Sequence, residues 1–120
     1  MRHQVTVRDT ARAVGSGDVP VLATPRLIAW LEAATVVAAA PFLTAGQTSV
    51  GTAIRVAHRR ATPVGGSVEV VVTEPVAQDG RRLTFAVRAL DADGEIVADG
   101  EIERAVVDRE RFVAALGTRD

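Results

Sequence analysis

Glu32 stands almost alone as a charged residue in an apolar stretch, TPRLIAWLEAATVVAAAP, which covers residues 24–41. After Arg26, no other side chain of this stretch ionises. A carboxylate that loses its water needs a partner, and no basic residue lies three or four positions away on the same predicted helix. If Glu32 is buried, its partner must therefore come from the predicted sheet or from another subunit. Such a group is a candidate general base or nucleophile, and the alternative is a solvated position on the outer edge of the helix.

His58 is the second candidate for acid–base chemistry. Alternate residues of a strand point to opposite faces. In the predicted strand 48–61, one face collects Val50, Thr52, Ile54, Val56, His58 and Arg60, and the other collects Gly51, Ala53, Arg55, Ala57 and Arg59. We expect the first face to pack against the helix, so that His58 and Glu32 point into the same space. The alternative is a hydrogen-bonded histidine of the core or its rim, and the other histidine, His3, lies at a terminus.

Three further residues have a structural interpretation of their own. Thr24 carries a hydroxyl group, but a threonine directly before Pro25 is typical of a helix cap. Gly51, inside a strand, is typical of a bulge or of relieved strain. Arg104 lies between two apolar positions on one face of the last strand, which favours a packing or interface arginine over a catalytic one.

The composition excludes several classes of function. The 120 residues include no cysteine and no lysine, which removes thiolate nucleophiles, thiolate zinc ligands and Schiff-base chemistry. A net charge of −1 lacks the basic footprint of nucleic-acid binding. With two distant histidines and no suggestive carboxylate spacing, we expect no metal site and no cofactor. The apolar run 27–43 is too short to predict a membrane span and the N-terminus lacks a signal peptide, so we expect a cytoplasmic protein.

The pattern along the chain predicts one α+β domain over residues 1–120. Residues 4–14 alternate and predict a first strand. A long helix is expected to begin at Thr24–Pro25 and to end near Ala40–Pro41. Period-two alternation then predicts four strands, 48–61, 66–77, 82–91 and 95–107, followed by a short helix over 108–116. Asp and Gly in the turns at 78–81 and 91–94 favour hairpins, so we expect the helix to lie across a four-stranded meander.

Several motifs taken together resemble one family. The helix start LATP, the helix WLEAA, the strand SVGTAIRVAHRRATPVG, the hairpin DGRRLTF and the last strand GEIERAVV are similar to hotdog-fold thioesterases of the fluoroacetyl-CoA thioesterase-like group. The resemblance runs from about Val21 to Val107. It implies a hotdog fold, in which an antiparallel sheet wraps a long helix. It also implies a homodimer or a dimer of dimers that binds acyl-CoA at the subunit interface.

The resemblance further implies roles for individual residues. The catalytic threonine, glutamate and histidine of the family fall on Thr24, Glu32 and His58. The family's strand glycine, near the acyl group, falls on Gly51, and the arginine of its final strand falls on Arg104. Glu32 would then act as base or nucleophile in the hydrolysis of an acyl-CoA thioester, Thr24 would orient Glu32 or the acyl group, and His58 would transfer a proton. Coenzyme A is part of the substrate in this interpretation.

The resemblance leaves alternatives at the rim and in the function. Arg59 and Arg60 are candidates to meet the phosphates of coenzyme A, although solvated surface arginines are the simpler interpretation. A non-catalytic acyl-CoA-binding hotdog domain is the alternative function, whereas a hotdog dehydratase is disfavoured because no histidine lies within residues 21–57. The fluoroacetyl-specific enzyme has aromatic residues over its acyl pocket, in a longer segment before the helix. Here the segment GSGDVPV is short and has none, so the sequence argues against fluoroacyl selectivity.

Overall fold

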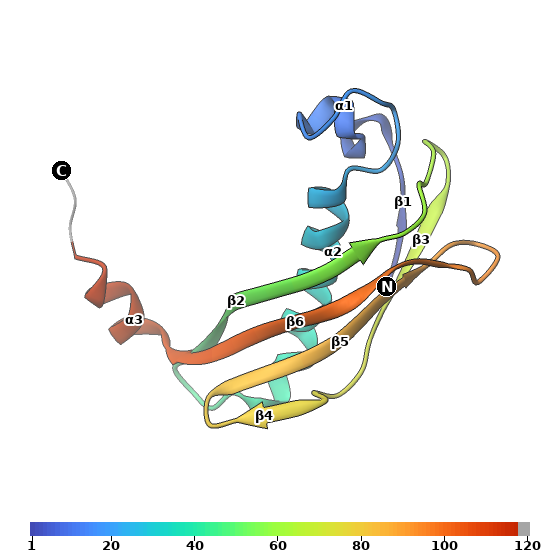
Figure 1. Ribbon diagram of the computed structural model, residues 1–120. Helices are drawn as coiled ribbons and strands as arrows, with labels where there is room; N and C mark the ends of the chain where they lie inside the picture. The colour runs from blue at the N-terminus through green and yellow to red at the C-terminus, as the bar shows by residue number, and fades with distance from the viewer. Residues whose placement is uncertain (118–120) are drawn as a thin grey trace.

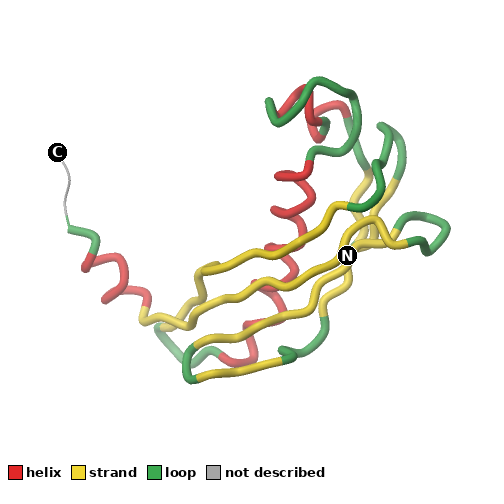
Figure 2. The backbone as a smooth tube through the Cα atoms, viewed as in Figure 1, coloured by secondary structure: helices red, strands yellow, loops and turns green. Residues whose placement is uncertain are grey.

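One long helix lies against a curved antiparallel sheet in the computed structural model, which describes residues 1–117 (Figure 1). In chain order the elements are β1 (Arg2–Gln4), α1 (Ala11–Val14), α2 (Thr24–Ala39), β2 (Gln47–His58), β3 (Ser67–Val72), β4 (Ala77–Asp79), β5 (Arg82–Leu90), β6 (Ile96–Asp108) and α3 (Arg109–Ala115). Two 3₁₀ helices cover Val7–Asp9 and Ala40–Phe42. The predicted α+β class is confirmed, and the tube in Figure 2 separates the single long helix from the strands.

Helix α2 packs on the sheet through one stripe of side chains. The buried residues recur at every fourth position, and they are Leu27, Leu31, Thr35 and Ala39. This spacing keeps them on one face of a helix, where they meet a core that includes Phe85 and Ile102 of the sheet. The helix begins next to Pro25 and gives way to a 3₁₀ turn that contains Pro41, as the sequence predicts.

The order of the strands differs from the predicted meander. The sheet runs β1-β3-β5-β6-β2, with β4 paired to β5 outside this path. Strands β3, β5 and β6 do follow one another as a meander, but β2 pairs with β6 and has no ladder with β3. Strand β6 spans Ile96–Asp108, and its length gives β2 a partner along all of Gln47–His58. Strand β2 is therefore an edge strand.

The N-terminal segment also differs from the predicted strand 4–14. Only Arg2–Gln4 is a strand, and it pairs with β3. The Asp9 carboxylate accepts hydrogen bonds from the backbone N–H and the hydroxyl of Thr6. The Thr10 hydroxyl then accepts from the N–H of Ala13 at 3.2 Å. These local side-chain bonds replace a strand ladder and turn the chain into a 3₁₀ helix followed by α1.

A β-bulge in β2 decides which residues face the helix. The register with β6 shifts between Gly51 and Ala53, so that Thr52 and Ala53 both lie opposite Glu103. The alternation of side chains between the two faces of the strand reverses at this point. Gly51 consequently faces α2, as His58 does, whereas the Thr52 hydroxyl bonds Glu103 at an exposed position. The bulge at Gly51 is confirmed, the predicted face is correct for His58, and it is wrong for Val50, Gly51 and Thr52.

Gly100 allows the two long strands to approach each other at the bend of the sheet. A Cβ atom at this position would overlap the Arg55 carbonyl oxygen and lie 2.7 Å from the Val56 Cα atom. Because both obstacles belong to the backbone, Gly100→Ala is expected to lower the free energy of unfolding by about 3 kcal/mol. Urea denaturation followed by circular dichroism measures this loss.

Gly94→Ala is the matched control for that substitution. Its backbone has a φ of 81° and open space around the added methyl group, so it should cost only about 1 kcal/mol of left-handed strain. Equal losses in the two variants would show that the close approach at Gly100 is unimportant.

Candidate functional site

Thr24 and His58 form a hydrogen-bonded pair where α2 begins and β2 ends. The Thr24 Oγ1 atom lies 2.7 Å from the His58 Nδ1 atom. The predicted cap role of Thr24 is wrong, because Ala23 occupies the cap position and no side chain caps the helix. Thr24 is the first residue of the helix, and its hydroxyl group is directed to the strand rather than to its own backbone. Thr24 therefore bonds a residue of the distant strand β2 and not the backbone of its own helix.

The environment of His58 favours the neutral imidazole. Burial lowers the pKa of His58 below its ordinary value of 6.5, with the backbone of Arg60 opposing the shift. When the Thr24 hydroxyl donates to Nδ1, the neutral ring carries its proton on Nε2. Nε2 is buried and has no hydrogen-bond partner among the described residues. In this tautomer the Nε2–H group is a donor that no described residue satisfies.

Glu32 lies in a second cluster, against β2 and β6. Its Oε2 atom is 3.6 Å from Nη1 of Arg104, and the two side chains are 36% and 7% exposed. The same oxygen lies 2.6 Å from the place where a Cβ atom of Gly51 would be. The expectation that a partner for Glu32 comes from the sheet is therefore confirmed, and Gly51 leaves room for the carboxylate.

Arg104 is fixed by two residues that the sequence analysis missed. Its Nε donates to the Ser49 hydroxyl at 2.9 Å, and its Nη2 donates to the Ser49 carbonyl at 3.1 Å. Its Nη1 lies 3.5 Å from the Thr35 hydroxyl, which itself donates to the Glu32 carbonyl at 2.6 Å. Burial lowers the pKa of Arg104, and the Glu32 carboxylate opposes this shift. Spacing in the sequence could have indicated both residues, since Ser49 lies two positions before Gly51 on the same strand and Thr35 lies three positions after Glu32 on the same helix.

The two clusters do not meet within one chain. Thr24 and Glu32 are eight residues apart on α2, which is about 12 Å at the rise of an α-helix. Gly51 and His58 are seven residues apart on β2, which is roughly 23 Å along a strand. No hydrogen bond or ion pair within residues 1–117 links Glu32 to Thr24 or His58. The predicted common space for Glu32 and His58 is consequently absent from a single chain.

Arg59 and Arg60 follow His58 at the surface. Arg59 pairs with Asp99 at 2.9 Å, and Arg60 pairs with Asp91 at 3.2 Å. Both line an open cavity of about 320 Å³ that also contains Thr24 and His58. Their predicted contact with the phosphates of coenzyme A stays a prediction.

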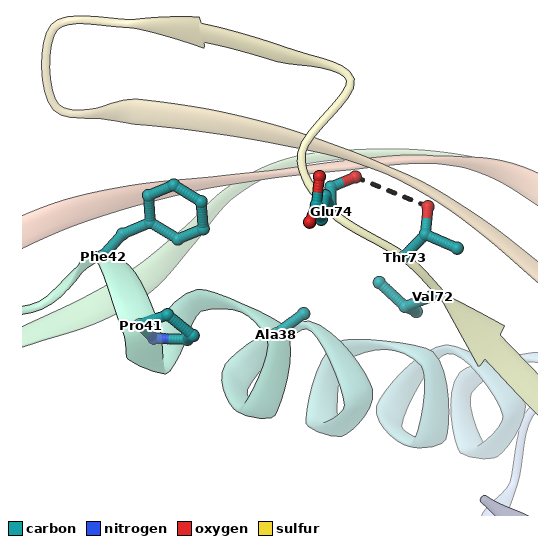
Figure 3. Close-up of a pocket in the computed structure, with 6 residues that line it drawn as sticks. All are labelled: Ala38, Pro41, Phe42, Val72, Thr73 and Glu74. Atoms are coloured by element: carbon teal, nitrogen blue, oxygen red, sulfur yellow. Dashed lines mark hydrogen bonds between the residues drawn. The ribbon is translucent and has the colours of Figure 1, made fainter.

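A larger open cavity of about 680 Å³ lies at the other end of α2. Figure 3 shows its lining, where Phe42 and Ala38 face Val72 and the segment that follows β3. It contains none of the residues of the two clusters. Within residues 1–117, no cluster of three potential metal ligands occurs and no helix is long and apolar enough to cross a membrane.

Solved structures place this fold in a known class. A hot-dog-like protein from Thermanaerovibrio acidaminovorans is similar with a TM-score of 0.83 and 26% identity, over 99% of this chain and 90% of that one. A mutant of the fluoroacetyl-CoA-specific thioesterase FlK, in complex with fluoroacetate and CoA, is similar with a TM-score of 0.86 and 36% identity, over 97% and 94% of the two chains. The class is that of hotdog-fold thioesterases.

Sequence comparison narrows the class to a family. Residues 5–110 match the family described as fluoroacetyl-CoA-specific thioesterase. The fluoroacetyl-CoA thioesterase of Streptantibioticus cattleyicolor is 45% identical over 94 residues, which are 78% of this chain and 66% of that relative. The chain thus spans just under two thirds of that relative's length. It belongs to the fluoroacetyl-CoA-specific thioesterase family, and the resemblance found in its motifs is confirmed.

The pKa of His58 gives a direct test of this geometry. We expect a native-state value below 6.5, so that the ring is neutral at pH 7. Because the native state then binds the proton less readily than the unfolded chain, the contribution of His58 to stability is present above about pH 6.5 and is lost as the pH falls through the native pKa.

A proton–carbon NMR titration of the imidazole signals measures this pKa. The variant His3→Gln assigns the signals, since His3 is the other histidine of the chain. A His58 titration at or above pH 6.5 would contradict the buried, Thr24-bound ring.

Proposed function

We propose that the protein hydrolyses an acyl-CoA thioester to the free acid and coenzyme A, at a site built by two copies of the chain. The observation that carries the proposal is the division into a Thr24–His58 pair and a Glu32–Arg104 pair. A base or nucleophile and a proton donor must act on the two ends of one thioester bond. The family is named for thioesterases, and a similar chain was solved with fluoroacetate and CoA.

The surface available for a second copy is the free edge of β2. This edge strand is 12 residues long, and its Ile54 side chain is 41% exposed. A long edge strand with unpaired backbone groups is a template for pairing with another chain. Closed two-fold pairing of identical edges also stops further growth of the sheet. These features support the homodimer expected from the resemblance.

The bulge makes a two-fold axis at Arg55 compatible with a shared site. When Thr52 and Ala53 are counted as one step, Gly51 and His58 each lie three steps from Arg55. An antiparallel pair of β2 strands centred on Arg55 therefore sets Gly51 of one copy opposite His58 of the other. Residues that lie opposite each other share a face, and directly paired side chains are about 5 Å apart. Glu32 of one copy then meets the Thr24–His58 pair of its partner.

The chemistry follows from this arrangement. Glu32 attacks the thioester carbonyl carbon or takes a proton from an attacking water, and the electron pair of the carbonyl moves to its oxygen. When the intermediate collapses, the carbon–sulfur bond breaks and the Nε2–H of His58 protonates the departing thiolate, while Nδ1 takes up a proton from water through the Thr24 hydroxyl, so that the ring stays neutral. Water supplies the hydroxyl group of the free acid. Thr24 holds the imidazole in the tautomer that this step requires.

The surroundings of Glu32 suit a charge that changes during the reaction. The guanidinium group of Arg104 lies beside the carboxylate and is itself held by Ser49 and Thr35. Fixed charges in a partly dry site stabilise a developing charge without moving. Backbone amides at the start of α2 or near Gly51 can serve the carbonyl oxygen in the same way.

Two substitutions test the catalytic roles. Glu32→Gln and His58→Ala are each expected to reduce turnover of short acyl-CoA esters by roughly 10²–10⁴-fold, because each removes a proton-transfer or nucleophilic group. Free-thiol detection of coenzyme A measures turnover, and circular dichroism checks the fold. Full activity in both folded variants would exclude the mechanism, and binding without turnover in the native protein would identify a non-catalytic acyl-CoA-binding domain.

Mixing the same two variants tests whether the site is shared. After refolding together, half of the dimers are mixed and each mixed dimer has one intact site out of two, so about a quarter of the native activity returns. No return of activity in verified mixed dimers would place Glu32 and His58 of a working site in one chain.

Gly51→Ala tests the contact between the carboxylate and the strand. The added methyl group would lie 2.6 Å from Glu32 Oε2, at the end of a side chain that can move aside. We therefore expect an unfolding free energy within about 1 kcal/mol of the native protein but roughly 10²-fold lower turnover, since a displaced reacting group is costly. Unchanged turnover would show that this position of Glu32 is not the working one.

The acyl group is a separate question. The matched relatives are named for fluoroacetyl-CoA, which weighs against the expectation drawn from the short segment before α2. Fluoroacetyl-CoA therefore belongs in the substrate panel beside acetyl-CoA and longer acyl-CoA esters.

A further inference from the structure

Helix α3 and its C-cap residue Leu116 present apolar side chains that their own chain leaves partly exposed. Phe112, Val113 and Leu116 are 40%, 60% and 63% exposed, although Phe112 also borders an open cavity of about 240 Å³ with Arg81 and Val107 of its own chain. At 100° per residue, these three side chains fall within about 100° of the helix circumference. An exposed apolar side of this kind is typical of an interaction surface.

Helix α3 follows the end of β6 that is paired with the start of β2, and β2 is the edge strand of the sheet. Asp108 is paired with Gln47, the first residue of β2, and its carboxylate accepts from the Arg111 N–H at 2.9 Å. This capping bond fixes how the helix leaves β6. In Figure 1, α3 extends past the end of the sheet and turns toward the side on which β2 forms the edge.

The dimer proposed above places a cavity of the second copy in that direction. In the pairing centred on Arg55, Gln47 of one copy lies beyond the His58 end of β2 in the other, because Gln47 is seven steps from Arg55 and His58 only three. Two strand spacings separate β6 from the partner's β2, about 10 Å, and α3 is itself about 10 Å long. The cavity that contains Thr24 and His58 is lined at this end by Arg60 and Ala61.

The cavity and the helix complement each other chemically. Apolar side chains form much of its lining, and they are Ala11, Val19, Val21, Leu22 and Ala61. None of its lining residues is Phe, Tyr or Trp. The other aromatic side chains are engaged elsewhere, since Phe85 is fully buried, Trp30 stacks on His3 at 4.3 Å, and Phe42 lines the larger cavity. Phe112 is the aromatic residue of the helix that follows β6 at the β2 edge.

We propose that α3 of one copy covers the Thr24–His58 cavity of the other, with Phe112 as the aromatic wall against which the acyl-CoA substrate packs. This inference rests on the β2-paired dimer and the hydrolytic function proposed above. The helix adds apolar surface to the substrate-binding cavity. It takes no part in proton transfer, so its loss affects KM more than kcat.

Disulfide trapping tests the position of α3, and the chain contains no native cysteine to interfere. We expect the double variant Val113→Cys/Val19→Cys to form a covalent dimer under mild oxidation, visible on a non-reducing gel and reversed by reductant. Each single-cysteine variant, and the double variant Val113→Cys/Val76→Cys, should stay monomeric on the gel, because Val76 lies beside β4, far from the proposed contact. Cross-linking of the Val76 pair instead of the Val19 pair would overturn the proposal.

Steady-state kinetics test the role of Phe112. Phe112→Ala is expected to raise KM for the best acyl-CoA ester roughly tenfold, and Phe112→Leu should recover part of the loss because it restores apolar area. Val76→Ala, at a comparably exposed position, should leave KM unchanged. A native protein that is dimeric and active through Glu32 and His58, yet insensitive to Phe112→Ala and free of the Val19 cross-link, would reject the α3 inference and leave the proposed function standing. A native protein that is monomeric, or that does not hydrolyse acyl-CoA esters, would contradict the proposed function and with it the α3 inference that rests on it.

Discussion

The bulge in β2 is the constraint on which both side-chain clusters, Thr24–His58 and Glu32–Arg104, depend. Side chains alternate along a strand, so Gly51 and His58, seven positions apart, would otherwise point to opposite faces. The extra residue opposite Glu103 reverses the alternation once, and both positions then face α2. Gly51 can receive the Glu32 carboxylate there, and His58 can reach Thr24. A regular strand would turn one of these two clusters toward the outer face of the sheet.

The fold must also accommodate the charged Arg104 side chain beside its apolar core. The Arg104 side chain is only 7% exposed, and a guanidinium group removed from water is costly unless its donors are satisfied. Ser49, Thr35 and Glu32 supply these partners from both neighbouring elements, β2 and α2. The cluster thereby fixes the helix to the strand at one defined point. The main effect of this cluster is to fix the positions of the Glu32 and Arg104 side chains, since buried ion pairs contribute little net stability compared with apolar packing.

The surfaces left without a partner have a common explanation in the proposed dimer. Within residues 1–117 the β2 edge has no neighbouring strand, and α3 points away from the rest of the structure. A second copy related by a two-fold axis through β2 supplies a strand to the edge and the missing half of each site. In that arrangement the same contact that completes the sheet also unites the reacting groups.

By itself, the sequence determined the elements that depend on nearby residues. Helix α2, its proline-marked ends, the two hairpin turns and α3 all follow from local periodicity and capping, and the isolation of Glu32 on its helix is visible in the residues alone. The motifs also identified the family. Only the tertiary structure decided the pairing of β2 with β6, the shift of faces at the bulge, the choice of Arg104 as partner for Glu32 and the bond from Thr24 to His58. These contacts join residues at least 34 positions apart, and local propensity carries no information about which distant surface a side chain will meet.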